Sequence, residues 1–150
     1  MMSGSSPNDQ DCDFCVIARG EDPSTEIIGE GPDWIAFFPL SPATPGHTLI
    51  IPKAHVRDLW SASPALGAAL VVAAIEIGRA IGEAVHPEGM NLITSAGETA
   101  EQTVFHLHLH VVPRWQRDGF GKIWPADGRF EDADLENVAD LIRGHLATVV

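Results

Sequence analysis

Apolar side chains recur along this chain in two spacings, one typical of strands and one typical of helices. Short apolar runs bounded by Gly, Pro, Asp or Glu predict strands at residues 27–28, 34–38, 47–51 and 90–94. The sequence Gly-Glu-Gly-Pro-Asp separates the first two runs, which favours a hairpin at this point.

Two longer stretches follow the helical spacing. Ser63 and Pro64 are a good N-cap and first-turn pair, and the apolar positions that follow them are Leu70, Ala74, Ile77, Ile81 and Val85. A second stripe, introduced by Asp132 or Asp134, consists of Leu135, Val138, Ile142 and Leu146. The predicted class is α+β, a mostly antiparallel five-stranded sheet with one long and one C-terminal helix packed on its apolar face. We expect a disordered tail over residues 1–11 and a single domain over residues 12–150.

The fifth strand of that sheet is predicted at residues 105–113, where three histidines occupy alternate positions. Side chains alternate between the two faces of a strand, so His106, His108 and His110 share one face and their apolar neighbours share the other. Imidazole titrates near neutral pH, which suits proton transfer, nucleophilic attack or metal binding. The outer two histidines would lie about 13 Å apart, which disfavours one metal ion held by all three rings. A nucleophile assisted by its neighbours fits the spacing better.

Composition narrows the classes of partner. The chain has 150 residues, a formal net charge of −12 and nine Lys and Arg residues. A nucleic-acid interface needs clustered basic residues, so we expect no nucleic-acid polymer as a partner. The chain has no unbroken apolar run of the ~18 to 20 residues that span a membrane, and its N-terminus does not resemble a secretory leader. We therefore expect a cytoplasmic protein with no membrane partner.

Three motifs, in this order, resemble the landmarks of the histidine triad family of nucleotide hydrolases and transferases. Residues 44–55 read Thr-Pro-Gly-His-Thr-Leu-Ile-Ile-Pro-Lys-Ala-His, residues 101–104 read Glu-Gln-Thr-Val, and residues 106–110 are the His-x-His-x-His run. The resemblance extends over about residues 12–124 and is greatest to the small bacterial branch of the family.

The resemblance implies a role for each residue of the site. The middle histidine, His108, would be the nucleophile, His110 would contact the phosphate oxygens or help to protonate the leaving group, and His47 would support them together with the amide of Gln102. The resemblance further implies that the nucleotide is held by Thr103, Val104, Ser95, Phe14, Ile17 and Phe37.

The same resemblance implies a reaction at the α-phosphate of a nucleotide conjugate, such as a phosphoramidate or a dinucleoside polyphosphate. A nucleotidyl-histidine intermediate would form, and water would release a nucleoside monophosphate without a requirement for Mg²⁺. The substrate would be a purine nucleotide or dinucleotide, and the protein a homodimer. Two alternatives stay open, namely a phosphorolytic nucleotidyl transferase and a non-catalytic nucleotide-binding protein.

The two cysteines of the chain, Cys12 and Cys15, form a Cys-x-x-Cys pair, which by spacing is half of a zinc site. The resemblance implies that His55 and His106 complete a structural zinc site. Two free thiols, or a redox pair, remain the alternatives.

The chain departs from the family pattern at three positions. Pro39 stands where relatives commonly have an acidic residue that binds the ribose hydroxyls, Ser95 stands where they often have asparagine, and Glu101 replaces the glycine before Gln102. Proline has no side-chain acceptor. The departures therefore predict weak discrimination between sugars.

Overall fold

The computed structural model describes residues 12–125 and 132–149. These residues fall into two compact units, one ending at Phe120 and one beginning at Gly121, and each is described by itself. The predicted tail, residues 1–11, lies outside the described residues, and the expectation of a single domain over residues 12–150 stays a prediction.

The first unit is built on a five-stranded sheet in which every neighbouring pair is antiparallel. Its strands are β1 (Ile27–Glu30), β2 (Trp34–Phe37), β3 (Thr48–Pro52), β4 (Gly89–Ile93) and β5 (Leu109–Arg114), in the spatial order β1-β2-β3-β5-β4. The sheet therefore has β1 at one edge and β4 at the other, and β5 lies inside it. The predicted α+β class and the five-stranded antiparallel sheet are confirmed.

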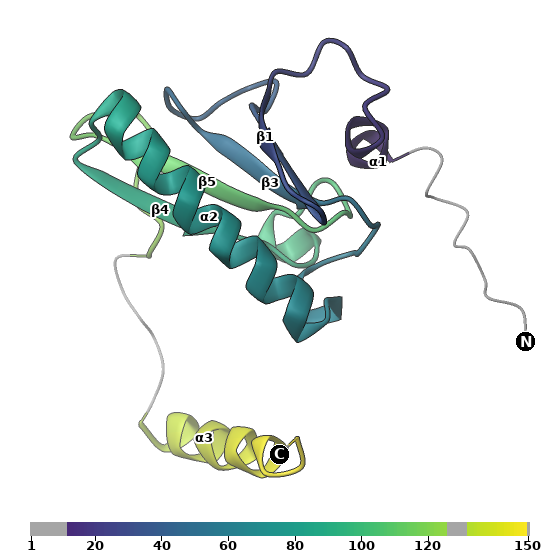
Figure 1. Cartoon of the computed structure of the whole chain (residues 1–150). Coiled ribbons are helices and arrows are strands. Elements are labelled where there is room, and N and C mark those ends of the chain that lie inside the picture. The colour runs from purple at the N-terminus through teal and green to yellow at the C-terminus, as the bar shows by residue number, and fades with distance from the viewer. Residues whose placement is uncertain (1–11, 126–131, 150) are drawn as a thin grey trace, which may run out of the picture. The chain divides into compact units, whose positions relative to one another are not determined.

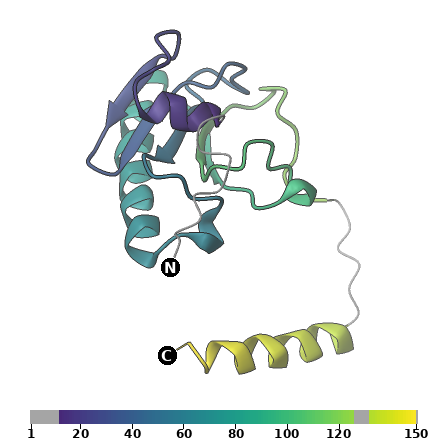
Figure 2. The same cartoon turned by 90° about the vertical axis from the view of Figure 1, so that its right-hand side faces the viewer.

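The long helix α2 (Pro64–Val85) runs along one face of the sheet (Figures 1 and 2). The hydroxyl of Ser63 accepts a hydrogen bond from the amide of Leu66 at 3.2 Å, which caps the first turn as predicted. The helix packs its apolar stripe on the sheet residues Ala36, Ile50, Leu109 and Val111 and on Leu107, which precedes β5 (Leu109–Arg114). By length and composition alone, α2 is also the one helix of the described residues that is apolar enough to cross a membrane.

The opposite face of the sheet carries the histidines and a second apolar cluster. A short helix that the sequence patterns did not predict, α1 (Asp13–Ala18), packs Phe14 and Ile17 there. Sheet residues complete this cluster: Ile35, Phe37, Leu49 and Ile51. Thus the face that bears the imidazoles is itself largely apolar, and the rings lie in a partly desolvated environment.

One predicted strand is shorter than expected. Hydrogen-bonded pairing with β3 and β4 begins only at Leu109 and His110, so His106 and His108 precede β5 in an irregular segment. The alternation of side chains nevertheless continues through this segment, since Leu107 is buried in the cluster under α2. Two short 3-10 turns, Leu59–Ser61 and Glu98–Ala100, were also not predicted.

The second unit contains the predicted C-terminal helix, α3 (Asp132–Leu146), which is confirmed. Its apolar residues Leu135, Val138, Ile142 and Leu146 are all more than half exposed within the described residues.

Candidate active site and metal centre

The ring of His108 is held so that one nitrogen is bound and the other is available. Its Nδ1 lies 2.7 Å from the backbone carbonyl oxygen of His106, and a carbonyl only accepts, so Nδ1 carries a proton. In the neutral ring Nε2 is then unprotonated and carries a lone pair. The hydroxyl of Thr94 donates to the carbonyl oxygen of His108 at 2.9 Å and fixes the backbone at this position.

His110 and His47 form a directed pair of imidazoles. The amide of Ala43 donates to Nδ1 of His47 at 3.0 Å, so the proton of His47 is on Nε2. That Nε2 lies 2.9 Å from Nδ1 of His110 and donates to it, which leaves the proton of a neutral His110 on its own Nε2. The rings of His108 and His110 are 4.8 Å apart between centroids. These successive hydrogen bonds therefore leave the Nε2–H group of His110 as a donor beside the Nε2 lone pair of His108.

Burial keeps this group of imidazoles uncharged. Desolvation lowers the pKa of His47, and it lowers the pKa of His108 against the opposing effect of the hydrogen bond to the His106 carbonyl. The pKa of His110 falls to about 4, first because of burial and then because of repulsion from His108 and His47. At neutral pH all three rings are therefore neutral imidazoles rather than cations.

The segment that precedes β3 places His47. Gly46 has φ +86°, and a Cβ there would lie 3.3 Å from Cγ of Pro113, so a side chain would be both strained and crowded. The hydroxyl of Thr44 donates to the carbonyl oxygen of Pro113 at 2.7 Å. The Thr-Pro-Gly-His sequence thus ties the loop to the far end of β5 and turns His47 toward His110.

Three residues predicted to bind the nucleotide lie together behind the histidines. Phe14 is edge-on to His108, with centroids 5.2 Å apart, and edge-on to Phe37 at 5.5 Å. Ile17 belongs to the same cluster, and each of these three side chains is at least nine-tenths buried. In this structure they pack with apolar sheet residues, Phe14 contacts the rings of His106 and His108, and the contact with a nucleotide stays a prediction.

The loop before the triad is organised by Gln102. Its side-chain oxygen accepts from the amide of Gly97 at 2.8 Å, and its nitrogen donates to the carbonyl oxygens of Arg57 at 2.8 Å and Val104 at 3.2 Å. Both amide hydrogens are therefore used, and donation to a phosphate oxygen would break one of these bonds. The catalytic role of Gln102 stays a prediction, as does nucleotide binding by Ser95, Thr103 and Val104. Thr103 is exposed, and Val104 and Ser95 are partly buried.

The four residues of the predicted metal site meet at one point. One ligand atom from each of Cys12, Cys15, His55 and His106 lies within 4.8 Å of every other. Nδ1 of His106 is 3.6 Å from Sγ of Cys12 and 3.5 Å from Sγ of Cys15, and Nδ1 of His55 is 3.2 Å from Sγ of Cys15. Ligands of a tetrahedral zinc ion lie about 3.3 to 3.8 Å apart, given zinc bonds of about 2.0 to 2.3 Å.

The orientation of His106 also suits a metal ligand. Its Nε2 donates to the carbonyl oxygen of Pro52 at 2.8 Å, which fixes the proton on Nε2 and leaves Nδ1 unprotonated toward the two sulfur atoms. The donor set of two thiolates and two imidazoles is one that zinc prefers. The residues therefore fit the ion that the sequence predicts.

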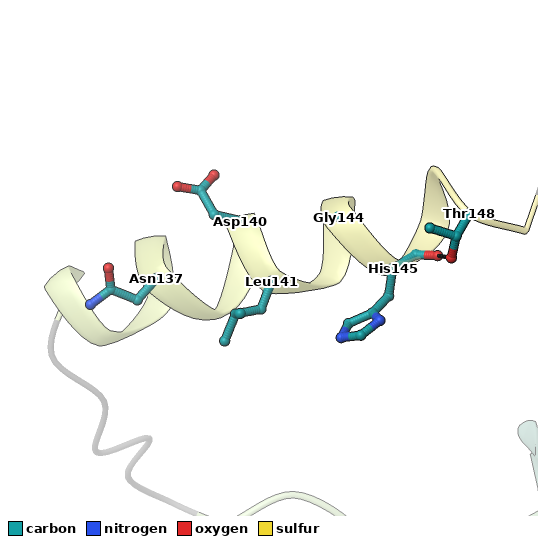
Figure 3. Close-up of a pocket in the computed structure, with 6 residues that line it drawn as sticks. All are labelled: Asn137, Asp140, Leu141, Gly144, His145 and Thr148. Atoms are coloured by element: carbon teal, nitrogen blue, oxygen red, sulfur yellow. Dashed lines mark hydrogen bonds between the residues drawn. The ribbon is translucent and has the colours of Figure 1, made fainter.

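A separate hollow of about 720 Å³ lies along α3, lined by Asn137, Asp140, Leu141, Gly144, His145 and Thr148 (Figure 3). All of its residues come from α3 and from the turn that follows it, which contains Thr148. Asp140 and His145 point away from each other, and Asp140 is paired with Arg143 at 2.8 Å. These side chains do not converge on a common point, so the hollow contributes no candidate chemistry.

Sequence comparison identifies the family of this chain. The model of the HIT domain matches residues 19–117, and the chain therefore belongs to the HIT, or histidine triad, family. The chain is 36% identical over 141 residues to "Protein hit" of Bacillus subtilis, an alignment that covers 93% of this chain and 97% of that one. It is 31% identical to the adenylylsulfatase HINT3 of Arabidopsis thaliana, with 97% of this chain and 74% of the relative covered.

A solved structure of the same family is also similar to this chain. The zinc-bound histidine triad family protein from Mycobacterium smegmatis matches with a TM-score of 0.70 and 38% identity, over 79% of this chain and 86% of that one.

Sequence reasoning missed the groups that orient the imidazoles. Ala43 and Pro52 act through backbone atoms, for which the side-chain pattern gives no signal. Thr94 was predicted only as the last residue of a strand. Because β4 pairs with β5, the hydroxyl of Thr94 lies close to the triad, and a correct prediction of the strand order would have pointed to this residue.

Proposed function

We propose that this protein is a nucleotide hydrolase that acts at the α-phosphorus of a nucleotide conjugate through His108. The observation that carries the proposal is the free Nε2 lone pair of His108, which follows from the hydrogen bond between its Nδ1 and the carbonyl of His106. A neutral imidazole with one nitrogen bound and the other unprotonated is ready to attack phosphorus. The relative named adenylylsulfatase supports chemistry at a nucleotide phosphate.

In the first step Nε2 of His108 forms a bond to the α-phosphorus, and the bond from phosphorus to the leaving group breaks. The leaving group keeps the bonding electron pair and takes up a proton from solvent. In the second step water attacks the phosphorus, the phosphorus–nitrogen bond breaks, and its electron pair returns to Nε2. Water loses one proton to solvent, so the net products are a nucleoside monophosphate and the protonated leaving group.

The His47–His110 pair would stabilise the phosphoryl oxygens in both steps. Its hydrogen bonds fix the proton of a neutral His110 on Nε2, so this ring offers a preoriented donor. A donor that is already aligned needs no reorganisation as charge develops in the transition state. This chemistry requires no Mg²⁺, and we further propose a purine nucleotide or dinucleotide as substrate and the cytoplasm as location.

Product analysis with a panel of substrates in ¹⁸O-labelled water tests this function. The panel contains adenosine and guanosine phosphoramidates, dinucleoside polyphosphates and adenylyl sulfate. We expect a nucleoside monophosphate that carries one ¹⁸O on its phosphate. A nucleoside diphosphate formed only when inorganic phosphate is added would instead identify a phosphorolytic transferase, and tight nucleotide binding without any product would identify a binding protein.

We also propose that the cysteine and histidine cluster holds one structural zinc ion, which ties α1 to the segment that carries the triad. The ligand distances and the fixed tautomer of His106 support this assignment. Metal analysis of protein purified without chelator should find about one zinc per chain. Absence of zinc together with free alkylation of Cys12 and Cys15 would refute it.

A homodimer that associates through β4 and α2 is the third proposal. Strand β4 lies at the edge of the sheet, next to a hollow of about 380 Å³ that both elements line. Large apolar side chains are exposed on these two elements: Val71, Val72, Ile75, Met90 and Leu92. An unpaired edge strand beside such a surface favours pairing with a second copy.

Light scattering of two matched variants tests the dimer. Leu92→Asp changes a half-exposed residue on β4, and Ile27→Asp changes a residue of similar exposure on β1 at the other edge of the sheet. We expect Leu92→Asp to be a monomer and Ile27→Asp to remain a dimer. A dimer in both variants would place the interface elsewhere.

A further inference from the structure

Cys12 and Cys15 lie on either side of Phe14 in the sequence, and Phe14 packs on the predicted nucleophile, His108. Cys12 is partly exposed and Cys15 is buried, whereas the ring of Phe14 lies 5.2 Å from the ring of His108. We propose that Cys12 and Cys15 are an oxidation site at which hydrogen peroxide forms a disulfide, releases the metal ion and thereby lowers turnover at His108. This inference rests on the proposed zinc site and hydrolase function.

The geometry permits the two sulfur atoms to join. They lie within 4.8 Å of each other, and a disulfide requires about 2.05 Å. Cys12 precedes α1 with extended backbone dihedrals, φ −82° and ψ 116°, and Cys15 lies in the first turn. Rotation of the Cys12 side chain toward Cys15 therefore breaks no helical hydrogen bond. The chain has two cysteines, so an intramolecular disulfide can only join this pair.

The difference in exposure assigns an order to the reaction. Cys12 is the more exposed of the two residues, so peroxide reaches it first; its thiolate attacks one peroxide oxygen, the oxygen–oxygen bond breaks, and a sulfenic acid forms. The thiolate of Cys15 then attacks the sulfur of Cys12, which forms the sulfur–sulfur bond and expels hydroxide. Two protons from solvent convert the two hydroxides to water. The two thiolates lose two electrons, peroxide gains them, and the zinc ion leaves because two of its four ligands are gone.

Metal release would loosen α1, because this helix is short and the metal would link its start to two distant histidines. It is six residues long, and the side chain of Cys12 does not cap it. Isolated helices shorter than ~12 to 15 residues are marginal in water, so α1 depends on its contacts with the rest of the protein. The metal would join it to His55 and His106, and after loss of the metal α1 would depend on packing contacts such as those of Phe14 and Ile17.

A shift of α1 acts directly on the predicted nucleophile. Phe14 contacts the rings of both His106 and His108, and His108 is only 6% exposed beneath it. Displacement of Phe14 would admit water to the imidazole and remove the ring that limits its rotation. Oxidation of the cysteines is thus transmitted to His108 through one aromatic contact.

Titration of the zinc-loaded full-length protein with hydrogen peroxide tests the inference. We expect about one zinc ion per chain to reach a chromogenic chelator, the mass to fall by two hydrogen atoms, and turnover of an adenosine phosphoramidate to fall more than about tenfold. The ring-proton NMR signals of His108 should move in parallel, because the edge-on Phe14 ring leaves. Dithiothreitol with zinc should restore all four readouts, and dithiothreitol with a chelator should restore only the mass.

The control variant is Cys12→His, which offers a fourth metal ligand without a second thiol. This variant should form no intramolecular disulfide and should release zinc at least about tenfold more slowly than the native protein under the same peroxide concentration.

Two results with zinc-loaded, active protein would overturn the inference alone. One is retention of zinc and of both thiols at peroxide concentrations that oxidise model zinc–thiolate peptides. The other is disulfide formation and zinc release that leave both turnover and the His108 signals unchanged. A purified protein without zinc, or one without turnover before peroxide is added, would instead refute the proposed metal site or hydrolase function, and this inference with it.

Discussion

His106 and His108 are two residues apart on one face of the same chain segment, yet their rings are arranged in opposite ways. His106 binds the Pro52 carbonyl through Nε2 and directs Nδ1 to two sulfur atoms. His108 binds the His106 carbonyl through Nδ1 and leaves Nε2 unprotonated toward the site. The comparison shows that the backbone carbonyl within reach of each ring decides which nitrogen is available, and the two proposed roles of these rings, metal ligand and nucleophile, depend on that difference.

The two regions also differ in their neighbours. Sulfur atoms from the start of α1 surround His106, whereas His108 lies beside the hydrogen-bonded pair of His110 and His47. Phe14 contacts both rings and is the physical link between the regions.

The largest expected effect is on turnover in His108→Ala. This change should lower kcat by at least about a thousandfold, because the nucleophile is lost, and should leave nucleoside monophosphate binding and zinc content nearly unchanged. Steady-state kinetics, calorimetry and metal analysis measure the three quantities. Full turnover in His108→Ala combined with inactivity of His110→Ala would assign the nucleophile to the outer ring.

The next effect concerns stability in the metal region. Cys15→Ser should lose zinc and lower the free energy of unfolding by about 3 kcal/mol or more, since the binding energy of a structural zinc ion contributes to folding. His55→Ala should behave in the same way. His145→Ala removes an exposed histidine from α3 and serves as the control, with no expected change in denaturant midpoint. Equal stability of all three variants would mean that the cluster holds no metal.

A smaller effect is expected from the low pKa of His110, which is about 4 in the folded protein and about 6.5 in the unfolded chain. The unfolded chain binds more protons between these values, so stability is fully present above pH 6.5 and falls as the pH decreases toward 4. The expected loss is at most about 3 kcal/mol. Denaturant unfolding at several pH values measures it, and His110→Gln should flatten the slope. An unchanged slope in that variant would indicate that His110 is not neutral in the folded protein.

The smallest effect concerns the sugar. Pro39 offers no acceptor for a ribose hydroxyl, so ribo- and 2′-deoxyribonucleotide substrates should differ by less than about tenfold in kcat/KM, or about 1.4 kcal/mol. Pro39→Asp should widen the difference in favour of ribose. A preference for ribose of a hundredfold or more in the unchanged protein would show that another residue supplies the contact.

The apolar pattern of the sequence predicted the helices and strands that have regular spacing. It did not predict the short helix α1 or the start of β5, which depend on contacts between distant parts of the chain. Helices α2 and α3 and the five strands follow from apolar periodicity and from the Ser63–Pro64 start signal. Helix α1 was missed because six residues are too few to show a helical period, and its anchors are distant in sequence. The predicted strand start at Phe105 was wrong because the segment before Leu109 leaves the sheet. Strand β3 continues to Pro52, beyond its last pair with β5 at Ile50 and Leu109, and the amide of Leu107 donates instead to the carbonyl oxygen of Val56, which no local pattern encodes.

The site was predictable to a similar extent. Alternation placed the three histidines on one face, and the family resemblance brought His55 to the cysteine pair, where the structure also places it. The tautomers were not predictable, since they depend on the carbonyls of Pro52 and His106 and on the amide of Ala43. The use of both amide hydrogens of Gln102 within its own loop was equally invisible in the sequence.

The opposite use of ring nitrogens in His106 and His108 is the central claim, and ¹⁵N NMR of the imidazoles in the zinc-loaded protein tests it most directly. Long-range proton–nitrogen correlations report which nitrogen of each ring carries the proton. We predict that His108 is protonated on Nδ1 with a bare Nε2, and that His106 is protonated on Nε2 with Nδ1 shifted by the metal. Protonation of His108 on Nε2, or a metal shift on Nε2 of His106, would contradict the account.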